Sequence, residues 1–197
     1  MIIGYIFPLK INHPLNHPFD PKEYVLKSGK TITIKAPSVS QAAELVALKR
    51  SYIRNTETIP LTLKEYPEDV EKEETLIQNF LDSENSMLLV AEYQGKLIGN
   101  IDINGHTRIK LAHTAWLGMA IHEDWRNQGL GAYLIERIIE WSRNRSDLEL
   151  IWLEAYATNA GGLHLYAKSG FIECGRMPHF FKEDDQEIDK VTMYLKL

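Results

Sequence analysis

Two short segments carry residue types and spacings that suit chemistry. The first reads Arg126-Asn-Gln-Gly129-Leu-Gly131 and lies between an expected strand and an expected helix. Glycines let the backbone turn sharply there and leave its N–H groups uncovered by side chains. These amides join the unpaired donors of the helix's first turn, where the helix dipole adds roughly half a positive charge. The segment therefore predicts a phosphate or diphosphate site, to which Arg126 adds a cation.

Two better-known phosphate motifs do not fit this segment. A P-loop would end in Gly-Lys-Ser or Gly-Lys-Thr, and neither follows Gly131. The dinucleotide fingerprint needs a third glycine and a parallel βαβ unit. Taken alone, the segment is therefore either a phosphate cradle of another kind or a plain tight turn.

The second segment runs from Asn159 to Phe171 and follows an expected strand with Glu154 near its end. Asn159 suits a helix N-cap, and Gly170 suits a left-handed helix end. Tyr166 lies about two helical turns beyond Asn159, so both side chains project from one face. The Gly161-Gly162 pair is unusual in a helix, because each glycine costs roughly 1 kcal/mol relative to alanine. It indicates either a loosened first turn or a close approach of the backbone to a ligand.

The composition sets the class of protein. The chain has 197 residues, 44% of them hydrophobic and 25% charged, which is typical of one globular domain and excludes wholesale disorder. A net charge of −5 argues against a nucleic-acid-coating protein, so no nucleic-acid partner is predicted. The single cysteine, Cys174, allows no internal disulfide and no cysteine-based zinc cluster. One cysteine suits the reducing cytoplasm.

The N-terminal segment differs from the rest of the chain. Residues 1–9 are apolar, but they are too few for a membrane span and lack the basic start of a secretory signal. Four of the eight prolines follow closely, which disfavours regular elements. We therefore expect residues 1–30 to be an irregular extension or arm and residues 31–197 to form the domain.

No metal site is predicted. His13 and His17 have the spacing of two ligands on one helix face, but the neighbouring prolines exclude a stable helix. Both histidines are therefore interpreted as solvated loop residues.

Hydrophobic periodicity predicts a mixed order of strands and helices. Strands are expected at 31–35, 87–93, 96–103, 113–122, 148–155, 171–181 and 188–197. Helices are expected at 43–52, 67–81, 130–141 and 160–168. Gln94-Gly95 and Asn104-Gly105 are interpreted as hairpin turns, which predicts an antiparallel meander.

These features together resemble a known family. The strand ending Met119-Ala120-Ile121, followed by Arg-x-x-Gly-x-Gly, resembles motif A of the GNAT superfamily of acyl-CoA N-acyltransferases. The segment 159–171 resembles its motif B, Asn-x-x-Ala-x-x-Leu-Tyr-x-x-x-Gly-Phe. The match is close over 113–171 and looser elsewhere, and 1–30 resembles nothing known. The resemblance implies an α/β (α+β) fold, with a mostly antiparallel mixed sheet of about six or seven strands, splayed between the fourth and fifth, and about four helices.

The resemblance also implies a cofactor and its site. Acetyl-CoA would lie in the gap of the splayed sheet, with its pyrophosphate on the backbone amides of Gln128, Gly129, Gly131 and Ala132. The backbone at Met119 and Ile121 would pair with the pantetheine arm and polarise the thioester. The implied cofactor-binding residues are Met119, Ala120, Ile121, Arg126, Asn127, Gln128, Gly129, Leu130, Gly131, Ala132, Asn159 and Tyr166.

Acetyl transfer to an amine also needs an acid and a base. An alkylammonium group has a pKa near ~10.4, so something must remove its proton at neutral pH. The resemblance gives Tyr166 the role of acid. Some relatives place the basic glutamate where this chain has Ala115, whereas Glu154 matches the position used in ribosomal-protein N-terminal acetyltransferases. A structural role for Glu154, with His113 or waters as the base, stays open.

The leading hypothesis is direct transfer of acetyl from acetyl-CoA to a primary amine in a ternary complex. The acceptor is either a small molecule or a protein N-terminus. A non-catalytic acyl-CoA-binding or regulatory module is the alternative, and a nucleotide-binding protein is a third hypothesis. The apolar N-terminal arm suits a homodimer contact, which is left as a prediction.

Overall fold

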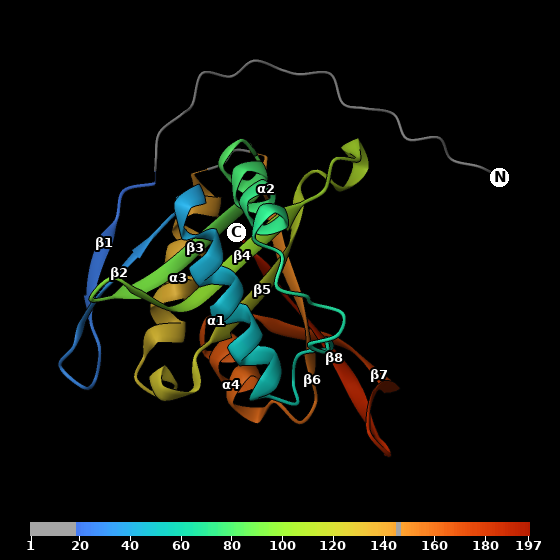
Figure 1. The fold of residues 1–197 in the computed structure, drawn as a ribbon. Helices are drawn as coiled ribbons and strands as arrows, with labels where there is room; N and C mark the ends of the chain where they lie inside the picture. Colours follow the sequence, from blue (N-terminus) through green and yellow to red (C-terminus); the bar gives the residue numbers. More distant parts are fainter. Residues whose placement is uncertain (1–18, 145–146) are drawn as a thin grey trace.

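The computed structural model describes residues 19–144 and 147–197, which form a mixed sheet covered by helices on both faces (Figure 1). The strand order in the sheet is β1-β2-β3-β4-β5-β6-β8-β7. The strands are β1 (Lys22–Val25), β2 (Thr31–Lys35), β3 (Met87–Tyr93), β4 (Lys96–Gly105), β5 (Thr114–Ile121), β6 (Leu150–Tyr156), β7 (Ile172–Glu183) and β8 (Gln186–Lys196). The helices are α1 (Ala42–Arg54), α2 (Val70–Leu81), α3 (Leu130–Arg143) and α4 (Ala160–Lys168).

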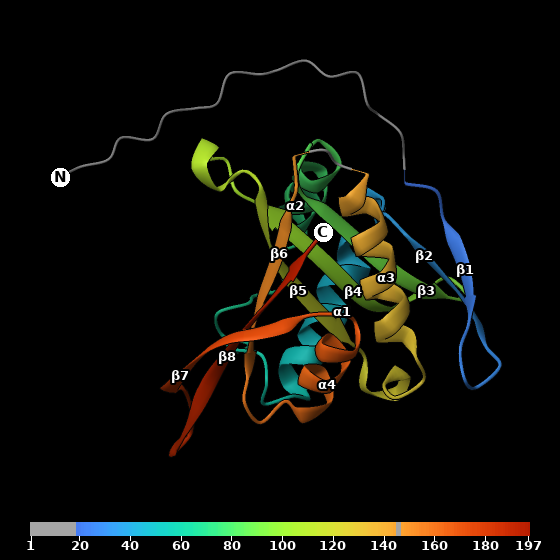
Figure 2. The ribbon, with the colours of Figure 1, turned by 180° about the vertical axis from the view of Figure 1, so that it is seen from behind.

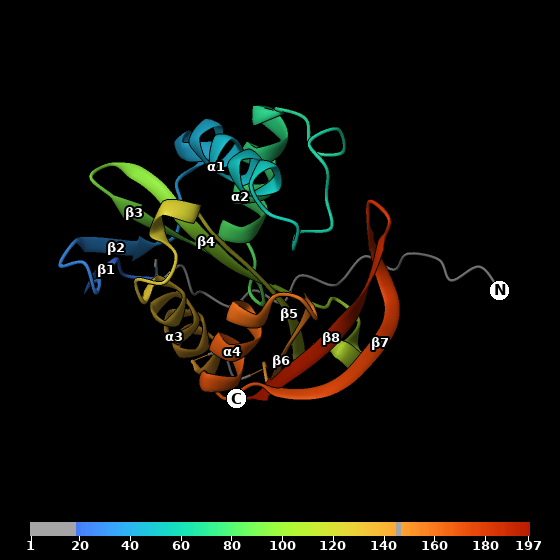
Figure 3. The same cartoon turned by 90° about the horizontal axis from the view of Figure 1, so that it is seen from below.

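The helices form two layers, because alternate residues of each strand face opposite sides of the sheet. Figure 3 shows α1 and α2 on one side and α3 and α4 on the other. On β3, Leu88 and Val90 pack in the cluster with α1 and α2, whereas Leu89 and Ala91 belong to the larger cluster with α3. None of the helices in the described ranges has the length and hydrophobicity that a bilayer crossing requires.

The first half of the sheet is the predicted antiparallel meander. Strands β2 to β5 pair antiparallel with their neighbours in chain order. Gln94 and Gly95 connect β3 to β4 with φ values of 49° and 78°. Positive φ at both central residues is the turn geometry that matches the twist of a hairpin, so this predicted turn is confirmed.

The sheet splays where the meander meets its second half. Strand β5 pairs parallel with β6 only from Thr114–Trp116 to Leu150–Trp152. Residues 117–121 of β5 then continue with no strand partner on that edge among the described residues, while β6 pairs along its whole length with β8. Counted from Thr31, β5 and β6 are the fourth and fifth strands, so the predicted position of the splay is confirmed. The predicted strand number was slightly low, because eight strands form within the described residues.

The interpretation of Asn104-Gly105 as a turn is wrong. Both residues lie in β4, where they pair with Trp116 and Ala115 of β5. Gly105 has a packing role instead, since an added Cβ would stand 2.4 Å from the carbonyl oxygen of Asn85. The chain turns only after residue 105, because β5 still supplies ladder partners up to that point.

The expectation of an irregular segment up to residue 30 is wrong for β1, which pairs antiparallel with β2 at the edge of the sheet (Figure 2). Tyr24 of β1 is 8% exposed and its ring lies 4.4 Å from that of Tyr133 on α3. Strand pairing and this contact hold the segment despite Pro21 before it. Residues 1–18, including His13 and His17, lie outside the described residues.

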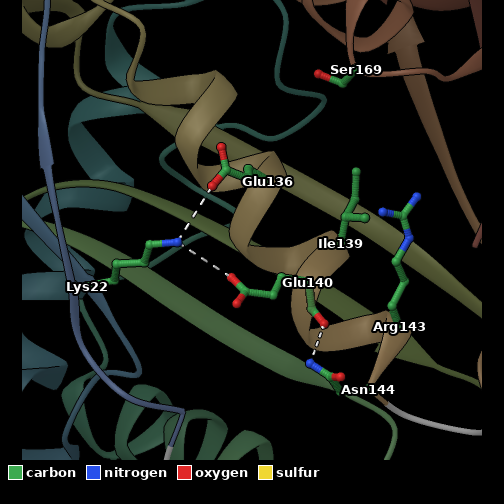
Figure 4. Close-up of a pocket in the computed structure, with 7 residues that line it drawn as sticks. All are labelled: Lys22, Glu136, Ile139, Glu140, Arg143, Asn144 and Ser169. Carbon is green, nitrogen blue, oxygen red and sulfur yellow. Dashed lines mark hydrogen bonds and ion pairs between the residues drawn. The ribbon is translucent and has the colours of Figure 1, made fainter.

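A polar pocket of about 530 Å³ lies between β1 and α3 (Figure 4). The Lys22 ammonium is 3.8 Å from Glu136 and 4.0 Å from Glu140. Nearby, the Arg137 guanidinium stacks 3.6 Å from the Phe19 ring centre and donates to the carbonyl of Asp20 at 2.8 Å. These contacts attach the start of the described chain to α3, and the exposed ion pairs themselves contribute little stability.

Candidate functional site

A cleft of about 740 Å³ opens where β5 and β6 separate. Its walls come from the end of α1, the end of β5, the loop before α3 and the whole of α4. The lining residues include Lys27, Tyr52, Met119, Ala120, Ile121, Arg126, Asn127, Gly129, Gly131, Ala132, Asn159, Tyr166 and Lys168. The structure thus brings most of the predicted cofactor-binding residues together, although Gln128 and Leu130 do not line the cleft.

The charges that line this cleft are all positive. Lys27, Arg126 and Lys168 contribute cationic side chains, and no aspartate or glutamate of the described chain is in the lining. The chain as a whole carries a net charge of −5. A local excess of cations within an acidic protein favours an anionic ligand at this place.

The loop before α3 carries unpaired backbone donors, two of them on residues that line the cleft, Gly129 and Gly131. Gly129 caps the helix with a φ of 94°, and Asn127 also has a positive φ of 60°. The N–H groups of Gln128, Gly129 and Gly131 donate to no acceptor within the described residues, whereas that of Ala132 donates to Gly129 O at 3.1 Å. Free N–H groups at a helix N-terminus form an anion-binding site.

Side chains hold this loop in place from both sides. Arg126 Nε donates to Ile121 O at 3.0 Å, which fastens the loop to the end of β5. Gln128 Nε2 donates to Asp124 O at 2.9 Å, and Gln128 Oε1 accepts from Ser28 at 2.7 Å. The loop between β1 and β2 therefore supports the site and brings Lys27 to it, a contribution missed by the sequence analysis because this stretch was expected to be irregular.

The free edge of β5 forms one wall of the cleft. Met119 and Ile121 pair with Ile101 and Gly99 of β4, and β6 does not pair with them. An unpaired strand edge presents alternating N–H and C=O groups, to which an extended ligand can bind as an added strand. This geometry suits the predicted role of residues 119–121.

Helix α4 forms the opposite wall. Asn159 caps it by accepting from the N–H of Gly162 at 3.0 Å. A Cβ on Gly162 would stand 2.7 Å from the Asn159 side chain, so this glycine makes room for the cap. Gly161 lines the cleft, and a Cβ there would have no described atom within 4 Å. Gly162 thus leaves space for the capping side chain, whereas Gly161 borders the cleft. The first turn of α4 is capped.

Tyr166 of α4 lines the cleft and is 7% exposed. Its ring meets that of Phe171 edge-on, with ring centres 5.8 Å apart. Burial raises the pKa of the Tyr166 phenol to about 12. The hydroxyl consequently keeps its proton at neutral pH and can serve as a hydrogen-bond or proton donor.

Tyr52 reaches the cleft from the end of α1, where the sequence predicts only a helix. Its hydroxyl is buried and has no hydrogen-bond partner in the part of the chain that the structure describes. Burial raises the pKa of this phenol well above its usual value, against the opposing charge of Arg126. A buried unpaired donor is costly, so a ligand that accepts its hydrogen bond gains affinity.

Glu154 lies outside the cleft lining. Leu153 and Ala155 are buried under α3 and α4, so Glu154 faces the other side of the sheet. Its Oε1 lies 2.6 Å from the Nζ of Lys190 on β8, and the two groups form a hydrogen-bonded ion pair. The role of Glu154 as the base thus stays a prediction.

No group of three or more metal-ligating side chains occurs in residues 19–144 and 147–197. The groups that could act in the candidate site are therefore its phenols, its backbone amides and its cationic side chains.

Comparison with known proteins assigns the family. Residues 52–171 match the Acetyltransferase (GNAT) family model, and the chain belongs to this family. The predicted recognition from 113–171 is thereby confirmed.

The individual relatives described next are 19–30% identical in sequence to this chain. A ribosomal protein bS18 alanine N-acetyltransferase of Escherichia coli K12 is 30% identical over 91 residues, which are 46% of this chain and 61% of that protein. The chain spans less than two thirds of the length of the curated relatives that it matches first. A GNAT-family acetyltransferase structure from Streptococcus pneumoniae is 28% identical, with a TM-score of 0.80 over 84% of this chain and 99% of that one. A structure from Salmonella typhimurium, solved with its cofactor acetyl-CoA, is 19% identical and shares the fold with a TM-score of 0.75, covering 84% of this chain and 94% of that one.

Proposed function

We propose that this protein is an N-acetyltransferase that moves an acetyl group from acetyl-CoA to a primary amine in a ternary complex. One observation carries the proposal: a single cleft is lined by cations, by unpaired amides and by the buried phenol of Tyr166. Family membership and the acetyl-CoA bound by a structural relative support the choice of cofactor.

In this proposal the cofactor lies between β5 and α4. The free N–H groups of Gln128, Gly129 and Gly131 bind the pyrophosphate, and Lys27 and Arg126 add charge-assisted contacts. The edge of β5 at 119–121 pairs with the pantetheine arm. Fixed backbone N–H groups of this kind contribute about 3–4 kcal/mol to oxyanion stabilisation in related acyl chemistry.

Tyr166 is proposed as the acid. When the C–S bond of the thioester breaks, the departing sulfur carries the negative charge and needs a proton. The Tyr166 phenol is protonated at neutral pH because its pKa is raised to about 12. For the base, the family resemblance favours Glu154 or a water, and Glu154 would act while leaving, or sharing, its contact with Lys190.

The acceptor is proposed to be a primary amine of a small molecule or of a protein N-terminus. The Escherichia coli relative acts on an alanine of a ribosomal protein, which supports an α-amino group. We further propose that the enzyme works in the cytoplasm and that the chain forms a homodimer. Analytical ultracentrifugation measures the last of these directly.

The test is a thiol-release assay with acetyl-CoA across amines, amino acids, polyamines and peptides with free N-termini. The wild-type protein should release CoA thiol with at least one acceptor. Tyr166→Phe should lower kcat by roughly 10²- to 10⁴-fold, the range of general acid catalysis, with an unchanged dissociation constant for CoA. Tyr24→Phe is the matched control, since Tyr24 is a buried phenol outside the cleft and should retain full activity.

Two outcomes would contradict the proposal in different ways. Full activity of Tyr166→Phe removes the acid role from this residue alone. Tight CoA binding in calorimetry, with no turnover over the whole acceptor panel, supports the non-catalytic acyl-CoA-binding module instead.

A further inference from the structure

Asp102 of β4 lies one strand behind the free edge of β5 and, like Glu154, is not among the residues that line the cleft. It pairs directly with Gly118 of β5, one residue before Met119, whose backbone is proposed to contact the thioester. Ile101 and Ile103 are buried in the cluster under α3. Because strand residues alternate, Asp102 faces the opposite side of the sheet, where α1 and α2 lie (Figure 3).

The carboxylate lies directly over the backbone of Gly118. A Cβ on Gly118 would stand 3.3 Å from Asp102 Oδ1 and 3.1 Å from the Trp116 ring. The other oxygen, Oδ2, accepts from Asn104 Nδ2 at 2.6 Å. Oδ1 accepts no hydrogen bond from any residue that the structure describes. One oxygen is thus held in position while the second is free for an incoming donor.

Charged groups from both covering helices face this carboxylate. Lys49 of α1 lowers its pKa, and Glu73 of α2 raises it. The Lys49 ammonium is itself bound to Glu73 at 2.6 Å, and Tyr66 donates to Glu73 at 2.7 Å, so neither charge acts alone. Burial dominates and raises the pKa of Asp102 to about 6. A base is most effective when its pKa lies near the working pH.

This part of the sheet face is open. Asp102 keeps partial exposure, Asn104 is exposed and Trp116 is 36% exposed. Figure 3 shows α1 and α2 on this side of the sheet, with β7 and β8 at the edge of the sheet beyond β6.

Glu154 of β6 lies across the splay from Gly118 of β5, at the same position along its strand. The parallel register pairs Trp116 with Trp152, so Glu154 is as far along β6 as Gly118 is along β5. The two carboxylates thus flank Gly118 from opposite sides, on the same face of the sheet. They differ in their partners, since the Lys190 ammonium binds Glu154 at 2.6 Å and Asp102 makes no ion pair within 4.0 Å among the described residues.

We propose that Asp102, and not Glu154, accepts the proton of the acceptor amine; this inference rests on the proposed acetyl transfer. Asp102 Oδ1 takes one proton from the ammonium nitrogen, whose lone pair then forms the C–N bond with the acetyl carbon. The C–S bond breaks, the sulfur keeps the bonding electrons and Tyr166 protonates it. Asp102 passes its proton to water, the second nitrogen proton also passes to water, and Tyr166 is reprotonated from water, so the products are the amide, CoA thiol and one released proton.

The experiment compares the pH dependence of kcat/KM in the wild type and in Asp102→Asn, with an amine that the wild type acetylates. The wild-type kcat/KM should rise through an inflection near pH 6, as the carboxylate loses its proton. Asp102→Asn should lose this inflection and fall by roughly 10²- to 10⁴-fold. Asp102→Glu, which restores a carboxylate, should recover part of the rate. Calorimetry with CoA should give the same dissociation constant for all three proteins, which shows that each is folded.

Two further variants make the result decisive. Asp82→Asn, at the exposed end of α2, is the matched control and should behave as the wild type. Glu154→Gln should keep the inflection near pH 6. If Asp102→Asn retains the wild-type profile, or if Glu154→Gln alone abolishes it, the assignment to Asp102 is wrong while the acetyltransferase proposal stands. If the wild type binds CoA and acetylates no amine, both proposals fail together.

Discussion

At the residue scale, burial acts on Tyr166 and Asp102 in the same direction and with different chemical results. It raises the pKa of the phenol to about 12 and that of the carboxyl to about 6, because a charged group is poorly solvated in both places. The phenol is thereby kept as a donor. The carboxylate instead becomes a stronger proton acceptor, with a pKa close to neutrality.

The raised pKa of Asp102 predicts how stability depends on pH. The unfolded carboxyl titrates near 3.8 and the folded one near 6, so its contribution to stability is present below about pH 4 and is lost between pH 4 and 6. Relative to the wild type, Asp102→Asn should therefore gain about 1–2 kcal/mol in free energy of unfolding between pH 4.5 and pH 8, allowing for partial exposure. Urea unfolding of the wild type and of Asp102→Asn at both pH values measures this difference in the free energy of unfolding. A difference that stays flat with pH would show that the carboxyl titrates normally.

The sequence identified some of these residues and missed others for a physical reason. Asn159 and Tyr166 could be found because a cap and a helical spacing are local features. Tyr52 and Asp102 could not, since a tyrosine in an amphipathic stripe and an aspartate in a strand are ordinary in sequence. Their surroundings come from segments far apart in the chain: Tyr52 of α1 meets the cleft of β5 and α4, and Asp102 of β4 lies over Gly118 of β5.

At the element scale, the start of α4 separates helix capping from ligand binding. Asn159 accepts from the N–H of Gly162 and also lines the cationic cleft. Asn159→Ala should cost roughly 1 kcal/mol of stability, because the cap is lost. Asn159→Asp retains a capping oxygen and should keep the wild-type stability, but its negative charge should weaken CoA binding.

Urea unfolding and calorimetry with CoA measure the two effects of the Asn159 variants independently. Asp69→Ala, which removes the corresponding cap of α2 outside the cleft, is the control and should lower stability without changing CoA affinity. Equal CoA affinity in Asn159→Asp and the wild type would show that Asn159 does not approach the phosphates or the pantetheine arm.

Two segments, Asn104-Gly105 and β1, adopt a structure that differs from the one their local sequence predicts. The turn at Gln94-Gly95 follows its sequence signal, whereas Asn104-Gly105 continues a strand. The same dipeptide pattern has a different outcome because β5 supplies hydrogen-bond partners and Asn85 packs against Gly105. Strand β1 is the reverse case, a weak local signal that pairing with β2 and contact with α3 make regular.

At the scale of the whole molecule, the two parts of the sheet are joined by only a short parallel ladder, from Thr114–Trp116 to Leu150–Trp152. A ligand wedged beyond it would contact both β5 and α4 and would bind only the folded protein. At a free concentration of about 100 times its dissociation constant, such a ligand adds about 2.7 kcal/mol. For a domain of this size we expect acetyl-CoA to raise the Tm by roughly 5–10 °C.

Scanning calorimetry with acetyl-CoA, and with ATP at the same concentration, tests this expectation. ATP should produce a clearly smaller shift, because it lacks the pantetheine arm that pairs with the edge of β5. An equal shift with ATP would favour the nucleotide-binding hypothesis. Raising the salt concentration should weaken the effect of acetyl-CoA, since cations at the cleft mouth contribute to binding and are screened.

Local patterns in the chain predict seven of the eight described strands, the four helices, the glycine-rich start of α3 and the phenol on α4, because periodicity, capping and turn chemistry are local properties. The family resemblance places the splay. Three relations follow only from the fold: the Lys27 N–H donates to Gln128 O in the loop before α3, Glu154 pairs with Lys190, and Asp102 lies over Gly118. These relations depend on strand register and on the packing of distant segments, which no local pattern in the chain encodes.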